Sequence, residues 1–243
     1  MPVGEKKVGL PELFYDLVFV YALSRTTELV HHADEADYVT FLISLVILFT
    51  VWSYQSIYIN RFGDNSWRDR LFLFADMFLL LFLSNAVGSD WLANFVPFNL
   101  ALGLLVGSVC LQYLLQLARH ASPEQRRRIK LVAGLRGLTA AMVLGSLLFP
   151  AHIGQWVALG GFGLGWILPT FVSHKQPAVN FPHLLERLNG LVIIFFGETV
   201  IDIAPYFHVA KFEIGALPVI VILFAMFTVY VMQFSYFIDE HKA

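Results

Sequence analysis

The chain has 243 residues, of which 58% are hydrophobic and only 14% are charged, whereas an average soluble domain has roughly 25% charged residues. This composition excludes a soluble enzyme domain and a disordered chain, and the single cysteine excludes a disulfide scaffold. The net charge of −2 gives no reason to expect nucleic-acid binding. We therefore expect an all-α protein that is embedded in a lipid bilayer.

Eight apolar runs follow one another along the chain, each close to the length of about 20 residues that a membrane-spanning helix needs. The expected helices are Leu10–His31, Tyr38–Asn60, Leu71–Val87, Phe95–Leu117, Ile129–Leu148, Ile153–Val172, Phe181–Ala204 and Ile214–Ile238. These runs fill the chain, so they predict a single integral membrane domain over residues 1–243. The sequence predicts a polytopic helix bundle.

The basic residues predict the orientation of this bundle. With the N-terminus placed in the cytoplasm, thirteen of the 16 lysines and arginines fall in the inner segments. The outer loops then hold only Lys211. Because lysine and arginine accumulate in cytoplasmic loops, this asymmetry predicts an even number of spans with both termini in the cytoplasm.

Charged residues also lie inside the predicted spans, where each one costs about 2.5–3.5 kcal/mol near the bilayer centre. Such residues must face the bundle interior, form pairs or line water. The acids are Glu12, Asp16, Glu28, Asp76, Glu186, Glu198 and Asp202, and the bases are Arg25 and Arg136.

Depth sorts these polar residues into two layers. The inner layer contains Glu12, Asp16, Asp76, Arg136, Glu186 and Arg187. The outer layer contains Arg25, Glu28, Asn85, Glu198 and Asp202. Both layers have more acids than bases, so we expect some acids to be protonated or to bind a cation.

Glu198 and Asp202 form the sharpest candidate site. They lie one turn apart on the same face of one helix, and Arg25 is the expected counter-charge at a similar depth. For Glu12, Glu186 and Arg187, which lie close to the membrane interface, a structural role in helix packing is the favoured interpretation.

Other features have simpler explanations. The small residues Gly161 and Gly165, four apart, predict close helix packing. The tryptophans near predicted interfaces indicate membrane anchors; these are Trp52, Trp67, Trp91 and Trp156. The basic run Arg126–Arg128 is explained by topology, with anionic lipid as an alternative partner. The sequence predicts no catalytic motif, cofactor or metal site, and it does not indicate the oligomeric state.

Three segments of the chain form a recognisable set of motifs. They are Pro11–Val20 (PELFYDLVFV), Asn60–Phe62 with Arg70-Leu71, and His183–Arg187 continuing to Gly197-Glu198-Thr199. In their order and spacing these motifs resemble the bacterial low temperature requirement A (LtrA) family. The resemblance implies a multi-pass protein of the bacterial cytoplasmic membrane, linked by name to growth in the cold. Family members are typically longer, so it also implies a short form.

Two functions remain open from the sequence. The first is a secondary transporter or an ion or proton conductor, in which the buried acids form a route for a small solute, a proton or a cation. The second is a non-transporting envelope, lipid-linked or cold-stress membrane protein, whose buried charges hold the bundle together. An enzymatic role is the least favoured of the interpretations.

Overall fold

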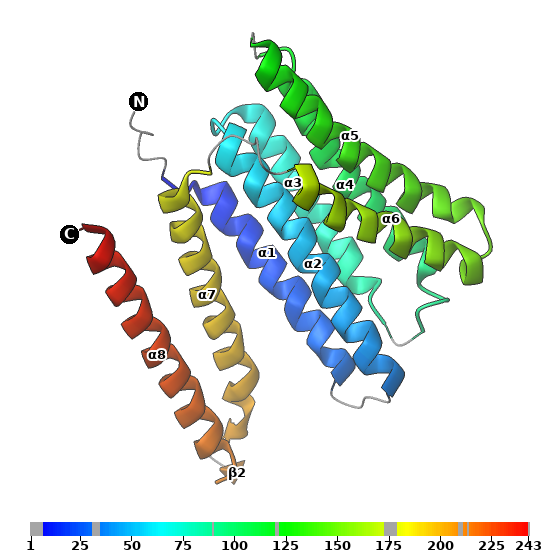
Figure 1. The fold of residues 1–243 in the computed structure, drawn as a ribbon. Helices are drawn as coiled ribbons and strands as arrows, with labels where there is room; N and C mark the ends of the chain where they lie inside the picture. Colours follow the sequence, from blue (N-terminus) through cyan, green and yellow to red (C-terminus); the bar gives the residue numbers. More distant parts are fainter. Residues whose placement is uncertain are drawn as a thin grey trace. The chain divides into compact units, whose positions relative to one another are not determined.

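The computed structural model describes residues 7–30, 35–88, 90–119, 122–172, 179–208, 211–212 and 214–242. Within these ranges the chain folds into eight α-helices, as the apolar runs predict, and one small β-ribbon (Figure 1). The elements are α1 (Leu10–Thr27), η1 (Glu28–Val30), α2 (Glu35–Phe62), α3 (Trp67–Asn85), α4 (Phe95–Gln116), α5 (Pro123–Gly145), η2 (Ser146–Leu148), α6 (Ala151–Val172), α7 (Phe181–Ile203), η4 (Ala204–Tyr206), β1 (Phe207–His208), β2 (Lys211–Phe212) and α8 (Ala216–Lys242).

Helix boundaries differ most from the prediction where a polar turn precedes the apolar run. Helix α5 begins at Pro123, so the basic segment Arg126–Arg128 is already helical. Helix α3 begins at Trp67, where the Ser66 hydroxyl accepts a hydrogen bond from the Asp69 N–H. These first turns are stabilised by proline and by capping, which an apolar window does not detect. The predicted end of the first helix, His31, lies outside the described residues.

Five helices are long and apolar enough to cross a membrane, judged over the described residues. The segments are Asp37–Phe62, Phe95–Gln116, Pro123–Leu148, Phe181–Tyr206 and Leu217–Phe234. Helices α1, α3 and α6 are not among them. In α1 the reason is its charge, because Glu12, Asp16 and Arg25 share 18 residues. The count of eight spans therefore stays a prediction.

The chain divides into two compact units, Met1–Leu188 and Asn189–Ala243. In the first unit α1 packs on α2 and α3, α4 packs on α2, α3 and α5, and α6 packs on α5 (Figure 1). Its core contains Tyr15, Phe19, Leu80 and Leu102, all at most 1% exposed. In the second unit, aromatic side chains of α7 and α8 meet, with the Phe196 and Phe227 ring centroids 5.2 Å apart.

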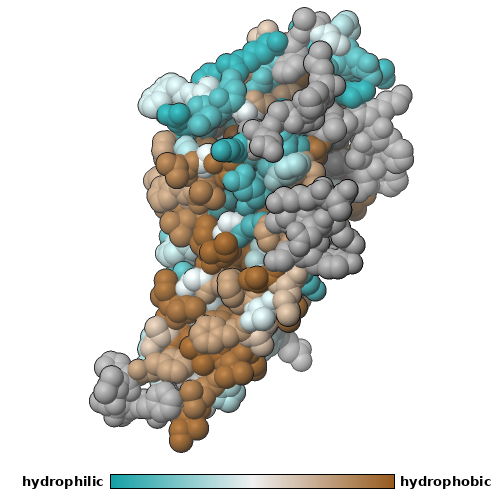
Figure 2. Space-filling view, turned by 90° about the vertical axis from the view of Figure 1, so that its left-hand side faces the viewer, coloured by the Kyte–Doolittle hydropathy of each residue, from teal (hydrophilic) through white to brown (hydrophobic). Residues whose placement is uncertain are grey.

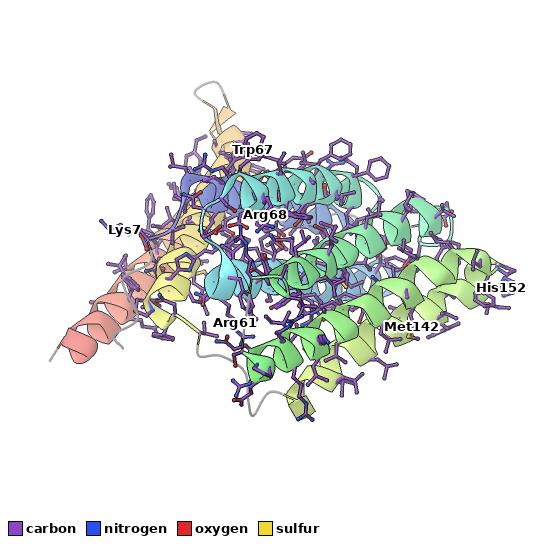
Figure 3. The ribbon with its side chains drawn as sticks, turned by 90° about the horizontal axis from the view of Figure 1, so that it is seen from above. Lys7, Arg61, Trp67, Arg68, Met142 and His152 are labelled. Carbon is purple, nitrogen blue, oxygen red and sulfur yellow. The ribbon has the colours of Figure 1, made fainter. Side chains whose placement is uncertain are left out.

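The predicted glycine contact joins α5 to α6. A Cβ on Gly161 would lie 2.5 Å from Cβ of Met142, a residue of α5 (Figure 3). A Cβ on Gly165 would lie 2.1 Å from Oγ1 of Thr139. Only glycine permits so close an approach, so these two positions set the distance between the helices.

The surface of the chain is largely apolar. Figure 2 shows apolar side chains over much of the face it presents, with hydrophilic side chains gathered toward its upper end. Large apolar side chains such as Phe78, Leu104 and Val221 are 43–69% exposed. Such a surface suits contact with lipid and not with water.

Candidate functional site

The first candidate site is a buried ion pair between α1 and α7. The Nε of Arg187 donates to both carboxylate oxygens of Asp16, at 3.1 and 3.0 Å, and Nη2 donates to Oδ1 at 2.9 Å. Both side chains are fully buried. Two parallel hydrogen bonds between a guanidinium and a carboxylate fix their mutual orientation. The pair therefore holds the start of α7 against α1.

Helix α2 completes the environment of this pair. The indole Nε1 of Trp52 donates to Oδ1 of Asp16 at 2.7 Å. The guanidinium carbon of Arg187 lies 5.6 Å from the Trp52 ring centroid and 5.7 Å from that of Tyr15. The prediction that Trp52 is an interface anchor is wrong, because its N–H is used inside the bundle and the residue is only 6% exposed. Trp67 and Trp156, each 70% exposed, do lie on the surface.

Glu12 and His183 extend the cluster toward the beginning of both helices. Glu12 lies in the first turn of α1, where its Oε1 accepts the Gly9 N–H at 3.4 Å. Its Oε2 lies 3.2 Å from Nε2 of His183 and 3.7 Å from Nη1 of Arg187. Both pairs, Glu12 with Asp16 and His183 with Arg187, are spaced by four residues, which places each pair on one helix face.

The tautomer of His183 follows from Asn60 at the end of α2. The Asn60 Oδ1 accepts the Asn180 N–H at 2.8 Å, and its Nδ2 donates to the Asn180 carbonyl at 2.9 Å. These bonds fix the amide so that Nδ2 also faces Nδ1 of His183, at 3.1 Å. Nδ1 must therefore accept, which places the ring proton on Nε2, facing Glu12. We call these six residues the inner ion cluster: Glu12, Asp16, Trp52, Asn60, His183 and Arg187.

The second candidate site surrounds Asp76 of α3. Gln112 of α4 donates to Oδ2 of Asp76 at 3.4 Å and to Oγ of Ser108 at 3.3 Å. Gln112 and Gln55 of α2 exchange amide hydrogen bonds of 3.0 and 3.1 Å. Asp76 is 1% exposed. No ion pair to it occurs within the described part of the chain.

Two buried oxygens remain without a hydrogen-bond partner at this second site, as far as the described residues extend. They are Oδ1 of Asp76 and the hydroxyl of Tyr15, on the neighbouring helix α1. Tyr15 directly precedes Asp16 in α1, and its ring centroid lies 5.7 Å from the guanidinium carbon of Arg187. Tyr15 therefore lies beside the inner ion cluster, on a helix that also packs on α3.

The inner layer of charges predicts an acidic partner for Arg136 of α5, but the structure gives it an aromatic ring and a backbone carbonyl. Its guanidinium carbon lies 3.2 Å from the centroid of the Tyr54 ring, and Nη1 donates to the Gly165 carbonyl at 3.1 Å. The Tyr54 hydroxyl donates to the same carbonyl at 3.1 Å. Pro169, four residues on, has no N–H to offer that carbonyl. Among the described residues, Arg136 thus replaces a missing helix bond and pairs with no acid.

The remaining predicted residues lie elsewhere. Arg25 pairs with Glu28 within the same segment, at 2.5 Å, and both are exposed. Glu186 is exposed and accepts the Val8 N–H at 3.3 Å. In the second unit Glu198 is half-buried and Asp202 is exposed. The roles proposed for these residues stay predictions.

Several residues of the two sites were not singled out from the sequence as site residues. They are Tyr15, Trp52, Gln55, Asn60, Ser108, Gln112 and His183. In the sequence, His183 was noted as the first residue of the His183–Arg187 segment that resembles the LtrA family, and not as a site residue. The four-residue spacing from His183 to Arg187 was a usable signal, whereas Gln55 and Gln112, 57 residues apart, carry no local pattern that links them.

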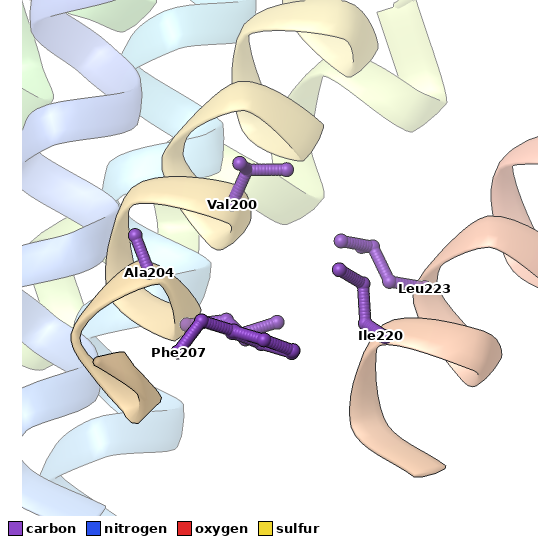
Figure 4. A pocket seen from close by; sticks show the side chains of 6 residues that line it. Val200, Ala204, Phe207, Ile220 and Leu223 are labelled. Carbon is purple, nitrogen blue, oxygen red and sulfur yellow. The ribbon is translucent and has the colours of Figure 1, made fainter. Parts of the chain in front are cut away.

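The second unit contains an apolar pocket of about 250 Å³. It lies between the end of α7 and the start of α8 (Figure 4). Its lining residues are Val200, Ile203, Ala204, Phe207, Ile220 and Leu223. The described lining residues are all apolar and carry no side-chain group that would bind an ion.

Comparison with known proteins agrees with the three sequence segments. The family model of the bacterial low temperature requirement A protein (LtrA) matches residues 7–243. Uncharacterized protein RA0937 of Rhizobium meliloti (strain 1021) is 26% identical over 261 residues, which cover 98% of this chain and 60% of that protein. The chain thus spans about 60% of the length of this relative. No solved structure matches this chain. Because the family model covers nearly the whole chain, the protein belongs to the bacterial LtrA family.

Proposed function

We propose that this protein is a multi-pass protein of the bacterial inner membrane that conducts or transports a proton or a small cation. It crosses the membrane eight times, with both termini in the cytoplasm. The observation that carries the proposal is the Asp76 carboxyl, which is 1% exposed and has no ion-pair partner in the described part of the bundle.

The energetic argument concerns the charge of this carboxyl. A carboxylate that is moved out of water without a cation carries a solvation penalty of several kcal/mol. Gln112 supplies a hydrogen bond but no positive charge. The group is therefore neutral with a bound proton or is balanced by a bound cation. Exchange of that proton or cation with the two sides of the membrane is the transport step that we propose.

The inner ion cluster supports a different role. Asp16 and Arg187 form a closed bidentate pair, which favours a role in holding the first turns of α7 against α1 and α2. This observation favours the second candidate function, a non-transporting membrane protein whose buried charges are structural. We assign the cluster to structure and Asp76 to transport.

The Asp76→Asn variant tests the proposal. Purified protein is reconstituted in liposomes that contain a pH-sensitive dye, and proton flux is followed under an imposed pH gradient and, separately, a sodium gradient. Because asparagine keeps the shape of the side chain but holds neither a proton nor a cation, we expect the variant to lose the flux of the wild-type protein.

The matched control is Asp90→Asn, since Asp90 is exposed in the connection between α3 and α4. This variant should conduct as the wild type does. Equal flux through wild type and Asp76→Asn would contradict the proposal, and the absence of flux from the wild type under both gradients would favour the structural alternative.

We also propose that the N-terminal turn of α5 contacts anionic lipid. Arg126 and Arg127 are exposed, and no ion pair to either occurs within the described residues, whereas Arg128 pairs with Glu124 at 2.6 Å. Basic side chains near a cytoplasmic surface gain about 1 kcal/mol each from anionic lipids. Replacing Arg126 and Arg127 by glutamine should reduce copurified anionic phospholipid, measured by mass spectrometry, and unchanged lipid content would contradict this contact.

A further inference from the structure

We propose that Asp76 and Tyr15 form a binding site for a dehydrated monovalent cation of the sodium class. The inference rests on the proposed function and deepens it, because it names the class of ion that the Asp76 site holds. The two ligands that we assign to it are Oδ1 of Asp76 on α3 and the hydroxyl oxygen of Tyr15 on α1. Helices α1 and α3 pack directly on each other.

The first step of the argument concerns the two oxygens. Tyr15 is fully buried and Asp76 is 1% exposed, and neither of these oxygens has a hydrogen-bond partner among the described residues. Buried polar atoms are normally satisfied, and an unsatisfied one costs about 1–3 kcal/mol. Two such atoms on helices that pack directly on each other point to a common bound partner.

The second step identifies the chemistry of that partner. The two oxygens do not hydrogen-bond to each other, so a proton on Asp76 alone leaves the Tyr15 hydroxyl unsatisfied. A cation coordinated by both oxygens satisfies both of them and balances the carboxylate charge. Carboxylate and hydroxyl oxygens are hard ligands, which suits a hard cation.

The third step concerns the charge and the rigidity of the site. One carboxylate balances one positive charge, which favours a monovalent over a divalent ion, since calcium sites use several carboxylate or carbonyl oxygens. Gln112 holds Oδ2 of Asp76 and is itself held by Gln55, which leaves Oδ1 directed to the ligand. The carboxylate is thus pre-oriented by α2 and α4.

The experiment measures cation binding separately from transport. Thermal unfolding of the detergent-purified protein is followed in choline chloride and after stepwise replacement of choline by sodium at constant ionic strength. A ligand that binds only the folded state raises the melting temperature in proportion to the logarithm of its concentration. We expect this rise for the wild type, and equilibrium dialysis with radioactive sodium should give one saturable site.

Matched variants locate the site. Asp76→Asn and Tyr15→Phe remove one ligand oxygen or its charge while keeping the shape, so both should lose the sodium-dependent shift. Tyr21→Phe is the control, because Tyr21 lies on the same helix and is 40% exposed; its shift should equal that of the wild type. Equilibrium dialysis is the readout for a variant whose thermal transition is too broad to evaluate.

The outcomes separate this inference from the proposed function. If the wild type shows no sodium-dependent shift and no saturable sodium binding, while Asp76→Asn still loses proton flux, the ion is a proton and the cation site is refuted. If sodium binds and both ligand variants abolish binding, but liposomes show no flux, the site stands and the transport proposal fails. Sodium binding that survives both substitutions places the ion elsewhere and overturns the inference.

Discussion

At the scale of single residues, the environment of a charge decides what it contributes. Asp16 and Arg187 are completely removed from water and meet through two parallel hydrogen bonds. Arg25 and Glu28 also form a pair, but both are exposed in the described structure. Removing one partner of a buried pair leaves an uncompensated charge, whereas an exposed pair contributes little.

Replacing Arg187 by methionine should therefore lower the free energy of unfolding by about 3–5 kcal/mol. Adding Asp16→Asn in the same chain should recover part of that loss, because an uncharged amide then replaces the unpaired carboxylate. Arg25→Gln is the control, with an expected loss of about 1 kcal/mol or less. Thermal unfolding in detergent compares the four proteins, and a double variant less stable than Arg187→Met would show that the carboxylate is not the source of the loss.

At the scale of one element, a proline within α6 explains why Arg136 is buried with no acid beside it in the described structure. The helix includes Pro169, which cannot donate to the carbonyl of Gly165. Arg136 and Tyr54 reach that carbonyl from α5 and α2. A proline is tolerated inside a membrane helix when a neighbouring helix supplies the missing donor.

A double-mutant cycle tests this role of Arg136. Pro169→Ala restores an N–H that donates to Gly165, so the arginine bond becomes redundant. Arg136→Met should destabilise the native chain more strongly than it destabilises the Pro169→Ala chain, by about 0.5–3 kcal/mol of coupling between contacting groups. If the effects of the two substitutions on the melting temperature are additive, Arg136 does not take the place of the hydrogen-bond donor that Pro169 lacks.

At the scale of the whole molecule, the asymmetry of basic residues is the main evidence for orientation. By hydropathy and charge, α1 and α3 are too polar to count among the membrane-crossing helices of the described residues. Nevertheless, α1 packs against both α2 and α3. Their charges are acceptable in a membrane because Asp16 and Asp76 face other helices instead of lipid. This packing is compatible with eight spans.

Reporter fusions test the orientation. A reporter fused after Ala243 should be active on the cytoplasmic side, and one inserted between Asp90 and Asn94 should be active on the outer side, because the basic loops stay inside. An insertion at Glu124, in the basic turn of α5, is the internal control and should report the cytoplasm. An external signal from the C-terminal fusion would contradict the even number of spans.

The sequence alone determined the eight helices of the described residues, the LtrA membership and the shared helix face of Glu12 and Asp16. Each of these depends on a pattern within a short segment: an apolar run, a motif or a four-residue spacing such as Glu12 to Asp16. The contact through Gly161 and Gly165 was predictable for the same reason, since small residues at that spacing mark a helix face that another helix approaches.

Only the tertiary structure decided which groups meet. Arg187 meets Asp16 across 171 residues, Trp52 turns inward, and Arg136 bonds to a carbonyl. These partnerships depend on how each helix is rotated about its axis and which helices are its neighbours, and neither quantity is encoded in a local window. Hydropathy places a charge at a depth in the membrane, but the packing of the surrounding helices determines whether that charge finds a partner or, as at Asp76, does not.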